Sequence, residues 1–237
     1  MLVDWLLVIA TLALAIVAAL QDVIRRLFLR PRLEATITVS PPDCHKTILR
    51  QRQIETKYEP AVGATRAFEK VHEADCYYFK LRVENSGNER AEKVEVFAAS
   101  LSKRDEVGKF RPVHDFMPLN LRWSNVHTTY LDAISPEMWK FCDLAHIIDP
   151  LKREPFDAEN NPRLGLPPEE TLLSLDLEVK PNNLLHLVPP GVYRIDIMIG
   201  AANSKPVSRT FEINHTGNWF DDEPTMLKEG IGFTRVE

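Results

Sequence analysis

The stretch that decides the fold reads Cys76-Tyr77-Tyr78-Phe79-Lys80-Leu81-Arg82-Val83-Glu84-Asn85. Every second side chain is apolar or aromatic, which places one set on each face of a β-strand. Ser86-Gly87-Asn88 then supplies residues typical of a turn. Residues 91–101 alternate again. We therefore expect two successive strands that form a hairpin or a Greek-key step.

Working outward, shorter alternating stretches recur along the rest of the chain. We expect further strands within residues 33–40, 118–124, 171–179, 193–199 and 207–213. About eight short strands separated by turn residues indicate a mainly β fold, an antiparallel sandwich. Two regions lack this pattern and are expected as long insertions: 43–75, with a short helix near 67–72, and 125–170.

A resemblance supports the sandwich. Residues 77–87, with Asn85-Ser86-Gly87 at their end, and then residues 91–96 are similar to the strand, N-x-G turn and strand of CARDB-like and related immunoglobulin-like modules. Residues 189–195 resemble the late P-G-x-Y strand of the same modules. The resemblance implies an immunoglobulin-like β-sandwich with long insertions, and it implies no particular function.

The N-terminus carries an uncharged apolar run from Trp5 to Leu20. Its length approaches the roughly 30 Å thickness of membrane hydrocarbon, so we expect a transmembrane helix. The alternative is a cleaved secretory signal, for which Val17-Ala18-Ala19 resembles a cleavage site. A signal peptide has positive charge before its apolar run, whereas Asp4 is the only charged side chain there. We therefore favour a retained anchor.

The charges that follow this run predict orientation and a lipid contact. Trp5 suits the membrane interface, and basic side chains on the cytoplasmic flank contact anionic headgroups. The expected division is residues 1–30 as helix and basic juxtamembrane segment, and 31–237 as the sandwich. We expect a single-pass protein of the inner membrane with its C-terminal domain in the cytoplasm. The basic residues are Arg25, Arg26, Arg30 and Arg32.

Few residues suggest chemistry. On a helix, Cys142 and His146 would share one face, and a thiolate with an imidazole suits zinc, with Cys44-His45 as further ligands. A cysteine–histidine nucleophile pair is a second hypothesis. The chain has neither a C-x-x-C motif nor the common hydrolase, phosphate-loop or dinucleotide signatures. We therefore expect no cofactor, no metal and no enzyme activity, with these residues in structural roles.

Met138, Trp139 and Phe141 bring three large apolar side chains together within four positions. Exposed, they would form a partner-binding edge; buried, they would belong to the core. Such a cluster makes them candidate partner-binding residues. The other apolar group, in residues 219–236, is expected to dock back on the domain.

The functional prediction is a membrane-anchored, non-enzymatic interaction or scaffold module whose protein partner is unknown. A net charge of −5 argues against a nucleic-acid-binding face. One alternative is a homo-oligomeric membrane protein that packs through Ala10, Ala13 and Ala18. The other is a metal-dependent enzyme that uses Cys142 and His146. The oligomeric state stays open.

Overall fold

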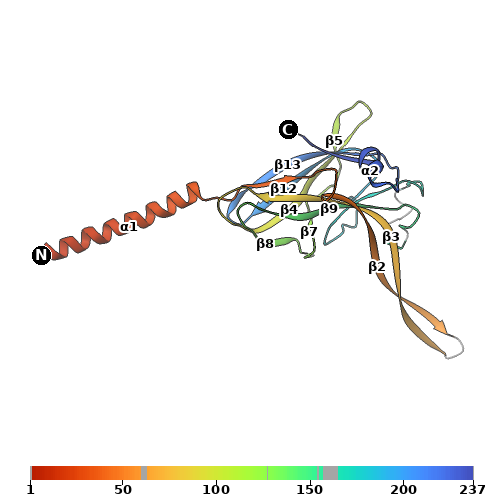
Figure 1. Ribbon diagram of the computed structural model, residues 1–237, viewed down its shortest axis with the longest axis horizontal. Coiled ribbons are helices and arrows are strands. Elements are labelled where there is room, and N and C mark those ends of the chain that lie inside the picture. Colours follow the sequence, from red (N-terminus) through yellow and green to blue (C-terminus); the bar gives the residue numbers. More distant parts are fainter. Residues whose placement is uncertain (1, 60–62, 127, 154, 157–164, 237) are drawn as a thin grey trace.

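A computed structural model of the chain contains two antiparallel β-sheets packed face to face, with extensions at opposite ends (Figure 1). It describes residues 2–59, 63–126, 128–153, 155–156 and 165–236. Side chains are not described for residues 2–4, 6, 22–28 and 59. At one end the helix α1 (Leu2–Phe28) extends away from the sheets, and at the other a long β-hairpin projects (Figure 1).

The first sheet has the strand order β1-β3-β9-β10-β11, with β2 beside β3 and β7 beside β9. Its strands are β1 (Leu33–Thr36), β2 (Cys44–Glu59), β3 (Ala64–Asn85), β7 (Arg122–Trp123), β9 (Met138–Ile148), β10 (Leu173–Leu175) and β11 (Leu187–Val188). We refer to this sheet as sheet A.

The second sheet, sheet B, has the order β14-β13-β12-β4-β5, with β6 and β8 also beside β4. Its strands are β4 (Ala91–Arg104), β5 (Phe110–Pro112), β6 (Leu119–Asn120), β8 (Tyr130–Ile134), β12 (Gly191–Ala201), β13 (Ser204–His215) and β14 (Ile231–Val236). A short helix α2 (Glu223–Thr225) and one turn of π-helix, η2 (Met226–Gly230), precede β14.

The alternating residues of the sequence fill the space between the sheets. Tyr77, Phe79, Leu81 and Val83 of β3 are fully buried in a core that also holds side chains from sheet B. Burial of one such side chain contributes about 1.5–3 kcal/mol. The mainly β fold with two packed antiparallel sheets thus agrees with the sequence pattern, and the strands within 76–85, 91–101, 193–199 and 207–213 are confirmed.

Three details of the strand prediction are wrong. Residues 125–170, expected as a long insertion without the strand pattern, contain β8 and β9. Of the two alternatives for β3 and β4, the hairpin is wrong, because they lie in different sheets and β4 pairs with β12; the Greek-key step stays a prediction. Residues 43–75 are not a loop with a short helix, because they form β2 and the first half of β3. Their polar–apolar alternation is weak because most of this hairpin is exposed on both faces.

The predicted transmembrane helix is also wrong on this structure. In the part of the chain whose placement is described, no helix combines the length and the apolar character that crossing a membrane requires.

The C-terminal segment docks on the domain, as expected. Met226, Ile231 and Phe233 lie in the main core, and Asp222 caps α2 by accepting a hydrogen bond from the Thr225 backbone N–H (3.0 Å). Asp222 therefore has a structural role within the run of acidic residues at 221–223.

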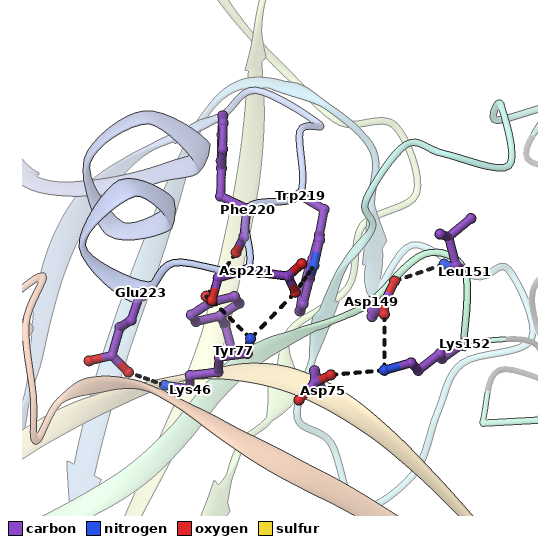
Figure 2. A network of polar contacts seen from close by, with 10 residues as sticks. All are labelled: Lys46, Asp75, Tyr77, Asp149, Leu151, Lys152, Trp219, Phe220, Asp221 and Glu223. Carbon is purple, nitrogen blue, oxygen red and sulfur yellow. Dashed lines mark hydrogen bonds and ion pairs between the residues drawn. The ribbon is translucent and has the colours of Figure 1, made fainter.

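The same segment closes over the base of the hairpin. The Tyr77 hydroxyl lies 2.8 Å from the Phe220 carbonyl oxygen, and the Lys46 backbone N–H donates to the Glu223 carboxylate at 2.5 Å. Lys152 joins the next loop through Asp75 at 2.9 Å (Figure 2). These contacts fix β2 and β3 where they leave the sandwich.

Candidate functional site: the open edge of β9

The three predicted partner-binding residues lie together on β9, near the strand's N-terminal end. Met138 is 51% exposed and Trp139 is 42% exposed, and Phe141 is half-buried. Trp139 and Phe141 contact each other edge-to-face, with ring centroids 4.8 Å apart. The structure therefore places this cluster at the surface. Of the two alternatives from the sequence, an exposed edge or a buried part of the core, the exposed edge is the one observed.

A groove of about 510 Å³ adjoins these residues. β9 supplies one wall with Met138 to Phe141. The opposite wall comes from β7, the loop that follows it and β8, and contains Trp123, Ser124, Asn125, Val126 and Leu131. The groove thus lies where the edge of sheet A meets a strand of sheet B.

The tryptophan at the bottom of the wall is held in place. Trp123 is 1% exposed, and its indole N–H donates to the Val94 carbonyl oxygen at 3.1 Å. Because the ring has one buried polar atom and that atom is paired, the wall is fixed before any ligand arrives.

β9 presents open backbone groups to this groove. β7 pairs with β9 only through Arg122–Asp143 and Trp123–Cys142, and the Ser124 N–H donates to the Phe141 carbonyl at 3.0 Å. Alternate residues of an antiparallel strand direct their backbone groups to the same side. Trp139 therefore directs its N–H and C=O to that side, where no strand of the described chain pairs with it.

Cations surround the aromatic pair. The Arg82 guanidinium lies 4.6 Å from the Trp139 ring centroid and pairs with buried Asp43 at 3.1 Å. The Lys80 ammonium lies 5.9 Å from the Phe141 ring. Lys140 is exposed, and no ion pair joins it to a carboxylate among the described side chains. The edge therefore offers a positive charge beside apolar surface.

Farther along the same outer face of sheet A lies a polar cluster that sequence reasoning missed. His146 Nδ1 is 3.0 Å from Asp176 Oδ1, and the Ser124 hydroxyl donates to Asp143 at 2.5 Å. Tyr78 stacks on the His146 ring. Burial is the main cause that raises the pKa of Asp143, and it also raises the pKa of Tyr78. Ser124 follows β7 and Asp176 follows β10, so the partners of Asp143 and His146 come from distant parts of the sequence and no local spacing pointed to them.

The predicted metal or nucleophile pair is not assembled. Residues 138–148 form a strand, so Cys142 and His146 are roughly 13 Å apart along β9. Cys142 packs in the main core, whereas His146 lies on the outer face. Cys44 is also in the core, and burial raises its thiol pKa to about 12. No cluster of three or more metal-binding side chains occurs in the described ranges.

The predicted lipid-contact residues lie at the other end of the molecule. Trp5 is 68% exposed on α1, while the side chains of Arg25 and Arg26 are outside the described residues. The Arg30 backbone N–H donates to the Asn88 side chain and that of Arg32 to Asn85. These bonds tie the chain after α1 to the β3–β4 turn; contact with lipid stays a prediction.

The alanines proposed to pack helices together, Ala10, Ala13 and Ala18, are exposed on α1. Packing of helices through these alanines stays a prediction.

The chain matches no protein-family model, no curated protein and no solved structure. The resemblance to CARDB-like and immunoglobulin-like modules therefore stays a prediction.

Proposed function

We propose that the protein is a non-enzymatic interaction module that binds an extended peptide segment along the open edge of β9. The observation that carries this proposal is an unpaired backbone edge at Trp139 directly beside a preformed groove. In strand addition, main-chain hydrogen bonds supply affinity and pockets for alternate side chains supply specificity. The β9 edge offers both.

The chemistry of the groove defines the peptide class. Met138, Val126 and Leu131 suit an aliphatic or aromatic side chain. Lys140 suits a neighbouring carboxylate, because it is an exposed cation beside the same edge. The expected ligand is a short extended segment with one large apolar residue and one acidic residue.

The test is selection of binders from a random peptide library displayed on phage, followed by titration of synthetic peptides. Trp139→Ala is expected to weaken binding by about 30-fold, equivalent to about 2 kcal/mol, because an exposed aromatic anchor is removed. Lys140→Glu is expected to weaken binding of the peptides that carry an acidic residue.

The matched control is Tyr58→Ala, which removes an aromatic side chain that is 60% exposed on the distant hairpin. It is expected to leave peptide affinity unchanged. Failure to select any peptide, or equal affinity of the wild type and Trp139→Ala for every selected peptide, would contradict the proposal.

A further inference from the structure

Beyond the sandwich, β2 and β3 continue as a two-stranded arm from the Ile48–Asp75 pair to the Glu59–Ala64 pair (Figure 1). β3 pairs with β9 only from Cys76 onward. Among the described residues, no third strand accompanies the arm. Its twelve residue pairs extend about 37 Å at about 3.4 Å per residue.

Only the base of the arm is supported. Phe156 packs with Ala74 and Leu49 in a small second core, and the Gln53 side chain donates to the Pro155 carbonyl at 2.8 Å. The contacts of Lys46 and Tyr77 with the C-terminal segment fix the other face (Figure 2). The arm thus leaves the body in a defined direction, and its outer half has no such support.

The arm exposes apolar side chains along one face. Ile48, Ile54 and Tyr58 are separated by even numbers of residues along β2, so their side chains lie on one face. Val71 of β3 opposes Arg52 and therefore lies on the same face. Their exposed fractions are 52%, 79%, 60% and 52%. A two-stranded hairpin is marginally stable in water, and a third strand or a packed face is what stabilises it.

The charges of the arm balance. Residues 48–59 and 64–75 hold five basic and five acidic side chains, so the net formal charge is zero. Three ion pairs, Arg50–Glu73, Arg52–Glu69 and Lys70–Glu55, join the two strands of the arm. With no net charge, the arm lacks the field that attracts nucleic acid or an anionic surface. Apolar contact and backbone pairing remain as its means of recognition.

β2 is an unprotected edge strand. It pairs with β3 alone, and its register is unbroken from Cys44 to Glu59. The arm portion of β2 contains no proline, glycine or bulge. Proteins commonly blunt exposed edges with such features or with charged side chains, because an open edge is a template for another strand. The charges of Arg50, Arg52 and Glu55 on β2 are paired with charges on β3, so they are neutralised within the arm.

The pattern of charges permits a second copy of the chain as the partner of β2. If β2 pairs antiparallel with β2 of a second copy about Ile54, Ile54 opposes Ile54 and Arg50 opposes Tyr58, with no like charges opposite each other. Self-pairing of β3 about any residue from Phe68 to Ala74 places like charges opposite each other, and pairing about Ala67 avoids this but brings only two alanines together at the axis. The β2 edge is therefore the one whose self-pairing also brings exposed large apolar side chains together.

We propose that two copies of the chain associate through their arms, with the β2 edges paired antiparallel about a twofold axis at Ile54. The product is a four-stranded sheet in the order β3-β2-β2-β3, which exceeds the three strands needed for independent stability. The contact uses the same surface of both copies, so it closes as a dimer and does not propagate into fibres. It is independent of the β9 edge.

Sedimentation of the full chain over a wide concentration range tests the proposal. The wild type is expected to dimerise, and Ile54→Lys, which places two ammonium groups at the axis, is expected to raise the dissociation constant at least about tenfold. The matched control is Val179→Lys, because Val179 is also 79% exposed and lies outside the arm. Trp139→Ala, which tests the peptide site, should leave the dimer intact.

A crosslink tests the register without a loss of affinity. Ile54→Cys is expected to form a disulfide-linked dimer on mild oxidation, whereas Val179→Cys and Phe68→Cys are not, and the three native cysteines are buried. A wild type that stays monomeric at every concentration would overturn the proposal. So would a dimer that Ile54→Lys leaves unchanged, or crosslinking through Phe68→Cys as efficient as through Ile54→Cys.

Discussion

Replacement of Asn85 by leucine is expected to be among the most damaging single changes outside the apolar core. Asn85 is fully buried. Its amide oxygen accepts from the Arg32 and Gly87 backbone N–H groups at 3.0 and 3.1 Å. Its amide nitrogen donates to the Glu89 and Ile134 carbonyls at 2.7 and 3.0 Å. One side chain thus joins the segment after α1, the β3–β4 turn and β8.

The expected loss of stability follows from these four hydrogen bonds. Each contributes about 1 kcal/mol net, so leucine, of similar size but without polar atoms, is expected to lower the free energy of unfolding by about 4 kcal/mol. Asn85→Asp keeps the two accepted bonds but turns a carboxylate oxygen toward two carbonyls, and is expected to cost about 2 kcal/mol or more.

Urea unfolding followed by tryptophan fluorescence measures both values, with the exposed Asn214 replaced by leucine as the control. If Asn85→Leu lowers the free energy of unfolding by less than about 1 kcal/mol, the side chain does not organise this junction and the reasoning fails.

Three further predictions concern a buried imidazole, a glycine and the thiols. Burial lowers the pKa of His215 from 6.5 to about 4, so the unfolded chain binds more protons between these values. The free energy of unfolding should fall by about 1.4 kcal/mol per pH unit from pH 6.5 down to about 4, and His215→Gln should flatten this slope in urea titrations at several pH values. An unchanged slope would show that other groups cause it. Gly87→Ala brings a Cβ to 2.4 Å from the Arg30 carbonyl oxygen, and a loss of about 2 kcal/mol or more is expected in the same assay; a neutral effect would contradict the close approach. The three cysteines are buried, and burial raises the pKa of Cys44 to about 12. A thiol reagent at neutral pH should therefore label them only after denaturant is added, and rapid labelling of the native chain would refute this.

The sequence predicted those strands whose two faces differ. In β3 and β12 one face lies in the core and the other faces outward, so period-two alternation was visible over 76–85 and 193–199. The strands of the arm were not predicted, because residues on both of its faces are exposed. A strand without a buried face needs no alternation of apolar and polar residues, and that alternation is the signal by which strands are recognised in a sequence. The segment 138–148 was ambiguous for the opposite reason: eight of its eleven residues are half-buried or fully buried. The i, i+4 spacing of Cys142 and His146, which would place them on one face of a helix, misled the interpretation.

The candidate site was predictable in part. Met138, Trp139 and Phe141 stood out because large apolar side chains gathered outside the best strands. Their groove was not predictable, because Trp123 and Leu131 come from β7 and from a strand of the other sheet. The open edge at Trp139 depends on β7 ending after two residues, which is a property of pairing between strands and has no local signal.

Hydrogen exchange at the Trp139 backbone amide tests the central claim most directly. With a selected peptide bound, strand addition should slow exchange of this amide strongly, while amides of the β2–β3 arm keep their rates. A bound peptide that leaves the Trp139 amide exchanging at its free rate would contradict the assignment of β9 as the binding edge.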